Sequence, residues 1–256
     1  MSMEQPATNQ RHKRAHPPRN KHILNGWVNL DKPYDMTSTQ AVGAVKRIMK
    51  PAKIGHAGTL DPLATGILPL ALGEATKTVQ YLMDSRKEYR FTVTFGTQTT
   101  TDDAEGEVIK ESDVRPDTDA ILAALPNYIG NIEQIPPIFS AIKIAGERAY
   151  DLARAGEIPE MKPRPVMIYR FELESRPDAD NAIFYVECGK GTYVRALARD
   201  ISLALGSCGH ISALRRTRVG SFTEEDTISL DELEKYATEI GQPSPEGWLH
   251  SVKRAL

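Results

Sequence analysis

A strict alternation of side-chain type over residues 89–95 is the feature that most constrains the fold of this chain. One face of the segment would carry the apolar residues Tyr89, Phe91, Val93 and Phe95. The opposite face would carry only Arg and Thr. A period of two with one apolar face predicts a β-strand that is buried on one side.

Helical patterns interrupt the strand patterns along the rest of the chain. Further strands are expected at residues 26–30, 167–174 and 182–188. Helices are expected from a cap at Thr37 or Ser38 to Pro51, and at about 119–125, 193–205 and 230–236. Because strands and helices do not alternate in a regular βαβ order, the sequence predicts an α+β fold.

The composition is that of an ordinary globular protein. The chain has 256 residues, of which 40% are hydrophobic and 26% charged, so it fits one large domain or a domain with a small appendage. No apolar run approaches the roughly 20 residues that span a membrane. The N-terminus lacks the apolar core of a signal peptide, and two cysteines give no disulfide framework, so a cytoplasmic location is expected. Cys208 and His210 are too few ligands for zinc, and no metal is expected.

Charge is segregated along the chain, although the formal net charge is only −2. Residues 1–24 carry five Lys or Arg and one acid, and residues 188–220 carry six and one. Residues 99–119 and 221–256 each carry eight acids, against two and three bases respectively. A focused basic region on an acidic body suits a polyanion bound at one place, and equally a solvated helix face.

Two segments are expected to lack regular structure. Residues 1–25 have hardly any apolar anchor and read as a disordered basic tail. The acidic stretch after Gly96 reads as a mobile loop.

The segment from Gly55 to Gly66, with the sequence GHAGTLDPLATG, carries the strongest chemical signal. It places a single carboxylate, Asp61, among small, turn-forming and apolar residues. Such a carboxylate has few local partners and is easily exposed, which suits a nucleophile. A turn or helix cap is the structural alternative for a lone aspartate.

Taken with four other segments, this loop closely resembles the TruB family of bacterial tRNA pseudouridine-55 synthases. The matching segments are 31–33 with 36–38, 55–66 continuing to 73–77, 87–89, 134–150, and 191–195 continuing to 214–217. They cover most of residues 26–222 in the order of the family. The resemblance implies a pseudouridine synthase fold, with a mixed, mainly antiparallel sheet flanked by helices and RNA-binding loops.

The resemblance also implies an activity and a partner. The family detaches uracil from C1′, rotates it and rejoins it through C5, without cofactor or metal. The substrate would be uridine 55 in the T loop of tRNA. No membrane and no obligatory protein partner are implied, and a monomer is expected.

Three residues match the catalytic positions of the family. Asp61 would be the nucleophile, and Arg195 its pairing arginine. Tyr89 would stack on the flipped base and help to move a proton. The structural alternatives are a phosphate contact or surface ion pair for Arg195 and a half-buried strand aromatic for Tyr89.

Three further residues match substrate-binding positions of the family. His56 would fill the gap that the flipped base leaves in the RNA. Tyr193 would form a hydrogen bond near the aspartate, and Leu214 would pack against uracil. Seven basic residues could each contact a phosphate or simply be solvated: Lys77, Lys143, Arg148, Lys190, Arg215, Arg216 and Arg218.

The expected organisation is a catalytic domain over residues 26–222 and a short C-terminal segment, 223–256, without a complete PUA domain. Three other functions compete with the tRNA enzyme. They are a guide-RNA-dependent pseudouridine synthase, a non-catalytic tRNA-binding or folding protein, and a hydrolase that pairs Asp61 with Asp102 or Asp103.

Overall fold

The structure, a computed structural model, describes residues 22–144, 146–157, 159–239 and 249–255. Its main element is a ten-stranded sheet. The strands are β1 (Gly26–Lys32), β2 (Ile54–His56), β3 (Ala64–Leu72), β4 (Lys87–Phe95), β7 (Gly130–Gln134), β10 (Arg164–Ser175), β11 (Asn181–Cys188), β12 (Gly209–Val219), β13 (Phe222–Thr223) and β14 (Leu249–His250). Two small hairpins stand apart, β5 (Thr97–Thr99) with β6 (Val108–Glu111) and β8 (Lys143–Ile144) with β9 (Glu147–Arg148).

Helices cover parts of this sheet. The α-helices are α1 (Ser38–Met49), α2 (Val79–Asp84), α3 (Thr118–Ala124), α4 (Ala149–Arg154), α5 (Val194–Ala204) and α6 (Leu230–Glu239). Short 3-10 helices follow at η1 (Gly73–Lys77), η2 (Leu125–Tyr128), η3 (Glu224–Asp226) and η4 (Val252–Ala255). None of the helices in the described ranges has both the length and the apolar character needed to cross a membrane.

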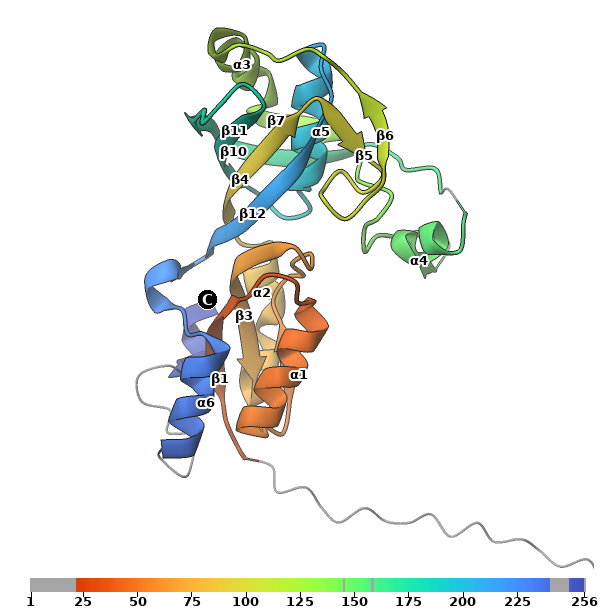
Figure 1. Ribbon diagram of the computed structural model, residues 1–256. Helices are drawn as coiled ribbons and strands as arrows, with labels where there is room; N and C mark the ends of the chain where they lie inside the picture. The colour runs from red at the N-terminus through yellow and green to blue at the C-terminus, as the bar shows by residue number, and fades with distance from the viewer. Residues whose placement is uncertain (1–21, 145, 158, 240–248, 256) are drawn as a thin grey trace, which may run out of the picture.

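The sheet passes through two lobes (Figure 1). Its strand order is β14-β1-β3-β12-β4-β11-β10-β7, with β2 paired to β3 and β13 to β12. One lobe holds β1, β3, α1 and α6, and the other holds β4, β7, β10, β11, α3 and α5. Between the named strands that the structure describes, only β3 and β12 run parallel. The predicted α+β fold with a mixed, mainly antiparallel sheet is therefore confirmed.

The predicted strand at 89–95 forms β4 from its third residue to its end. Phe91, Val93 and Phe95 are fully buried, and they pack in one core with the apolar stripe of α5. The polar face of β4 stays partly exposed. Alternation therefore indicated both the strand and the face that it buries.

Helix α1 begins and ends where its sequence predicts. Thr37 is the N-cap, and its side chain forms a capping box with Gln40. Lys50 closes the helix in a left-handed conformation, with φ 47°, just before Pro51. These local signals set where the helix begins and where it ends.

The stretch after Gly96 is not the mobile loop that its acidic composition suggested. It forms the β5–β6 hairpin, and Asp102 and Asp103 at its turn are buried. The reason is charge compensation, since both carboxylates face arginines of α5. An acidic run therefore becomes part of the interior when cations are available to pair with it.

The predicted disordered tail falls mostly on residues 1–21, which lie outside the described residues. The next four residues are part of the fold. His22 is bonded to Lys50 and Ala52 through the backbone, and Leu24 is buried. The Asn25 side chain accepts a hydrogen bond from the Glu74 backbone. The lobe that holds β1 and α1 also contains residues 224–239 and 249–255. There α6 lies against α1, and β14 pairs with β1.

Candidate active site

Asp61 lies in the turn between β2 and β3, and its neighbours are anchored on both sides. The Ser38 hydroxyl at the start of α1 donates to the Leu60 carbonyl (3.1 Å) and accepts from the Leu60 N–H (2.9 Å). On the other side, Lys32 Nζ donates to the Pro62 carbonyl at 3.1 Å. The backbone around Asp61 is thus fixed, while its side chain remains 38% exposed.

Lys32 is a buried cation that sequence reasoning left without a role. Its ammonium also donates to the carbonyls of Pro33 and Met36, at 2.9 and 2.7 Å. Burial lowers the pKa of Lys32 to about 8, against the opposing effect of the nearby Asp61 carboxylate. This lysine therefore holds the entry to α1 and the Asp61 turn together through backbone oxygens.

Arg195, the second residue of α5, forms the predicted ion pair with Asp61. The distance from Nε to Asp61 Oδ2 is 2.9 Å. The guanidinium also donates to the carbonyls of Thr101 and Phe139, each at 2.9 Å. Its side chain is only 7% exposed. A buried, multiply bonded guanidinium supplies a fixed positive charge, because its donors are held in a rigid fork.

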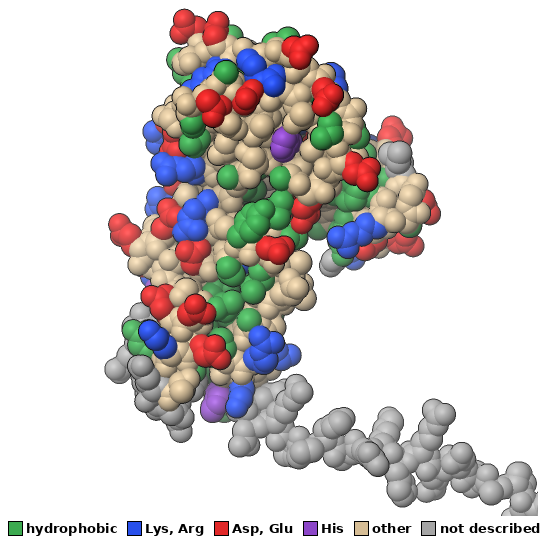
Figure 2. Space-filling view, viewed as in Figure 1, with side chains coloured by type: hydrophobic (Ala, Val, Ile, Leu, Met, Phe, Trp, Pro, Cys, Tyr) green, Lys and Arg blue, Asp and Glu red, His purple; other side chains and the backbone are tan. Residues whose placement is uncertain are grey.

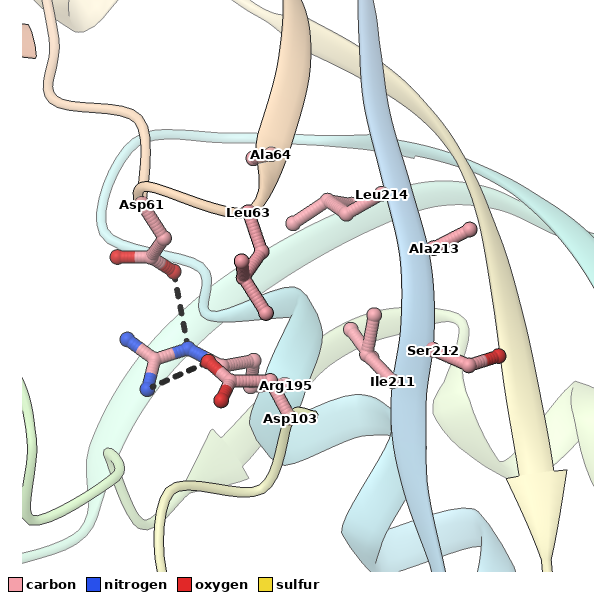
Figure 3. A pocket seen from close by; sticks show the side chains of 9 residues that line it. All are labelled: Asp61, Leu63, Ala64, Asp103, Arg195, Ile211, Ser212, Ala213 and Leu214. Carbon is pink, nitrogen blue, oxygen red and sulfur yellow. Dashed lines mark ion pairs between the residues drawn. The ribbon is translucent and has the colours of Figure 1, made fainter. Parts of the chain in front are cut away.

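A second carboxylate shares this guanidinium. Asp103 Oδ2 lies 3.6 Å from Arg195 Nη1, and Asp103 also accepts from the Thr101 hydroxyl and the Glu105 N–H. Figure 3 shows Arg195 between the two acids and the second oxygen of Asp61 turned away from it. A compensating cation between them disfavours a hydrolase in which Asp61 and Asp103 would share one proton.

The pocket beside Asp61 has an apolar wall. Leu63 and Ala64 line it from the start of β3, and Ile211, Ala213 and Leu214 line it from β12. Apolar side chains form a band across the junction of the two lobes in the same view of the surface (Figure 2). Leu214 and Asp61 therefore line the same pocket, and the contact of Leu214 with uracil stays a prediction.

Tyr89 belongs to the wall between the two lobes. It is half-buried and packs against two of the three hydrophobic cores, as does Leu214. Burial raises the pKa of Tyr89, so its phenol is protonated at neutral pH. In the sheet it lies opposite Arg216 of β12.

Arg216 is the buried residue that sequence reasoning placed wrongly. It was one of the candidates for a phosphate contact, but its side chain is fully buried. Its guanidinium donates to the carbonyls of Ile67 (2.7 Å), Gly58 (3.2 Å) and Thr59 (3.5 Å). Arg216 therefore supports the Asp61 turn from the sheet side. Charge alone could not reveal this, because the partners are backbone oxygens.

His56 and Tyr193 are not among the residues that line the pocket beside Asp61. His56 lies half-buried on β2, where burial and then the charge of Arg216 lower its pKa, so the ring is neutral at pH 7. Tyr193 is the N-cap residue of α5, and burial raises its pKa. The Gln134 side chain bonds both the N–H and the carbonyl of Tyr193, at 2.8 and 3.1 Å. This contact ties the end of β7 to the start of α5.

Most of the other candidate phosphate contacts are occupied by acids. The ion pairs are Lys77–Glu74, Lys190–Asp84, Arg215 with Asp31 and Glu224, and Arg218–Glu88. Lys143 is exposed, and the side chain of Arg148 lies outside the described residues. Among the described residues, no group of three or more His, Cys, Asp or Glu could hold a metal ion.

Comparison with solved structures supports this architecture. The chain is similar to a Cbf5–Nop10–Gar1 complex with a TM-score of 0.72 and 30% identity, over 95% of this chain and 68% of that one. It is similar to the archaeal box H/ACA sRNP Nop10–Cbf5 complex with a TM-score of 0.68 and 31% identity, over 91% and 62%. The likeness therefore extends through both lobes of the sheet.

Family models identify the class. The model of the TruB family pseudouridylate synthase N-terminal domain matches residues 46–194. Fold and family model together place the chain in the class of pseudouridylate synthase domains. The model of the tRNA pseudouridylate synthase B C-terminal domain matches residues 195–252. The chain belongs to the TruB family.

Curated relatives agree with this assignment. The tRNA pseudouridine synthase B of Bradyrhizobium diazoefficiens is 62% identical over 216 residues, which are 84% of this chain and 63% of the relative. That of Gluconacetobacter diazotrophicus is 60% identical over 210 residues, 82% of this chain and 69% of the relative. The chain thus spans roughly two thirds of the length of these relatives.

Proposed function

We propose that this chain isomerises uridine to pseudouridine in the T loop of tRNA, at position 55, with Asp61 as the nucleophile. One observation carries the proposal. In the Asp61–Arg195 pair the arginine is buried and bonded elsewhere, whereas the aspartate is exposed to a pocket. A structural salt bridge has no need for this asymmetry, but a nucleophile that must meet a substrate requires it.

The reaction is balanced within the substrate. The bond from N1 to C1′ breaks, a bond from C5 to C1′ forms, the C5 hydrogen leaves as a proton, and N1 gains one. Attack of Asp61 on C1′, its addition to C6, and its assistance in forming a glycal all use the free carboxylate oxygen that faces away from Arg195 (Figure 3). The apolar wall around Leu214 suits the uracil ring, whose faces are apolar.

Uridine in a folded RNA reaches this pocket only by leaving the base stack. We assign Tyr89 to stacking on the flipped base and Tyr193 to a hydrogen bond near the aspartate. His56 would occupy the vacated place in the RNA. A neutral, flat imidazole suits that role, and the pKa of His56 is lowered.

The test uses tRNA that carries tritium at C5 of its uridines. The native chain is expected to release tritium without added metal or nucleotide, and Asp61→Asn is expected to bind the tRNA without releasing it. Asp119→Asn, an exposed aspartate in the first turn of α3, is the matched control and should react at the native rate. Release by Asp61→Asn would refute the assignment of the nucleophile.

Sequencing of the treated tRNA at single-nucleotide resolution tests the position, and the expected result is pseudouridine at position 55 alone. A requirement for a second RNA would instead support the guide-dependent alternative. Sequence identity favours the tRNA enzyme. The chain is 60–62% identical to the relatives named for tRNA and 30–31% identical to the solved Cbf5 complexes.

We further propose that the chain acts in the cytoplasm as a monomer. Sedimentation of the purified protein would test the oligomeric state.

A further inference from the structure

A second arginine, Arg199, repeats the arrangement of Arg195 one helical turn further along α5. Its Nη1 lies 3.1 Å from Asp102 Oδ2, and its Nη2 donates to the Ile135 carbonyl at 2.7 Å. Its Nε pairs with Asp200 at 2.8 Å. The side chains of Arg199 and Asp102 are 15% and 8% exposed, so this pair is largely removed from water.

Asp102 adopts a backbone conformation that most residues avoid. Its φ is 58°, in the left-handed region that aspartate tolerates better than most side chains. Its carbonyl accepts from the Ile211 N–H at 3.0 Å, which hooks the hairpin turn onto β12. With the turn held this way, consecutive carboxylates reach successive arginines, Asp102 to Arg199 and Asp103 to Arg195.

We infer that the Asp102–Arg199 pair is a positioning latch for the active site: it fixes the hairpin turn that presents Asp103 to Arg195, and thereby the direction in which Arg195 meets Asp61. The inference rests on the proposed function. Asp102 and Arg199 do not line the pocket beside Asp61, so they are positioning residues. Arg199 also holds the Ile135 carbonyl, on the segment whose Phe139 carbonyl binds Arg195.

A purely structural role is the competing explanation. Loss of one partner from a buried ion pair leaves an uncompensated charge, so either role predicts a lower melting temperature. Only a positioning role predicts that the loss of rate caused by Asp102→Asn depends on the charge of Asp103. A rate measurement in two backgrounds therefore separates the two explanations.

The experiment compares Asp102→Asn in the native chain and in an Asp103→Asn chain. The measured quantity is the single-turnover rate of tritium release at saturating enzyme. We expect Asp102→Asn to lower the rate about tenfold in the native background, and less than about twofold where Asp103 is already neutral. Its effect on melting temperature should be the same in both. An equal loss of rate in both backgrounds, or none in the native chain, would overturn the latch.

Two further variants sharpen the result. Arg199→Gln should reproduce the loss, and Asp102→Asn with Arg199→Gln should lose no more than the larger single effect, because both act on one contact. Arg170→Gln is the control, since it breaks an exposed ion pair with Glu172 that is not part of the site. It should leave the rate unchanged.

Failure of the proposed function is distinguishable from failure of the latch. A native chain that releases no tritium refutes the function. The latch is then judged by amide hydrogen exchange. Faster exchange at the Asp102 and Ile211 amides, which are both hydrogen-bonded in the turn, supports it in Arg199→Gln, and unchanged exchange there overturns it.

Discussion

Single buried cations organise the candidate active site, and most of their partners are backbone oxygens. Lys32 and Arg216 are both fully buried, and each donates to three carbonyls, at least one of which lies in the Asp61 turn. Such bonds orient a loop without consuming a carboxylate, so the acid that remains exposed is the one available for chemistry. Motif matching identified Asp61, Arg195 and Leu214, whose spatial meeting the structure shows. Lys32 and Arg216 also lie in matched segments, but the match gave them no role at the Asp61 turn, because a lysine or arginine bound to carbonyls has no partner that a sequence reveals.

The burial of Lys32 has a consequence for stability. Its pKa is lowered to about 8 in the folded chain and returns towards 10.5 on unfolding. Between these values the unfolded chain binds more protons than the folded one, so the contribution of Lys32 to the free energy of unfolding rises with pH over that window. Urea unfolding from pH 8 to 10 in the native chain and in Lys32→Met measures this. The variant should show a smaller rise, and identical slopes would contradict the prediction.

At the scale of elements, helix α1 acts as a mount for the Asp61 turn. Its Ser38 hydroxyl, which is buried, satisfies both backbone groups of Leu60. Ser38→Ala would leave these two groups unpaired, and we expect a loss of about 2 kcal/mol in the free energy of unfolding. We also expect a slower single-turnover rate, because the turn loses an anchor.

Thr37→Ala is the matched control for that experiment. It removes the helix cap and should cost about 1 kcal/mol, but it leaves the contact with Leu60 intact. Its rate of tritium release should equal the native rate. If the two variants slow the reaction equally, the effect comes from the stability of the helix, and the mounting role is wrong.

Elements with a local pattern were predictable, and those without one were not. β4 alternates and α1 carries its own caps, so both were found from the sequence. β3 is buried along nearly its whole length and contains Pro69, so it shows no alternation. β12 carries three arginines, His210 and Ser212 among its apolar residues, and two register shifts break its pairing with β4. These two strands pair with each other beside Asp61. Because the pairing joins segments that are distant in the sequence, no local pattern predicts it.

At the scale of the whole molecule, the basic region at 188–220 is partly internal, because Arg195, Arg199 and Arg216 are largely removed from water. Its arginines pair with acids or bind carbonyls, so charge segregation in the sequence does not translate into an equally basic surface. We expect contacts with RNA phosphates to draw on other cations as well. The five Lys or Arg of the first 24 residues all precede His22, where the described fold begins.

Deletion of residues 1–21 is therefore expected to leave the melting temperature and the single-turnover rate unchanged. It should weaken tRNA binding at low salt, and the difference should vanish as salt screens the charges. Binding titrations at several salt concentrations measure the loss of affinity and its dependence on salt. Weaker binding that persists at high salt, or a lower melting temperature, would contradict this prediction.

The single parallel pairing between described strands, β3 with β12, also sets when the protein can begin to work. It joins Ala64 to Leu214, and Asp61 lies just before one strand while Leu214 lies on the other. Contacts between segments so distant in the chain form late in folding, since a long loop must close first. During synthesis the ribosome must release the chain beyond Leu214 before nucleophile and base wall can meet. A nascent or half-folded copy thus holds every residue of the Asp61 turn and still lacks the pocket that β3 and β12 form together.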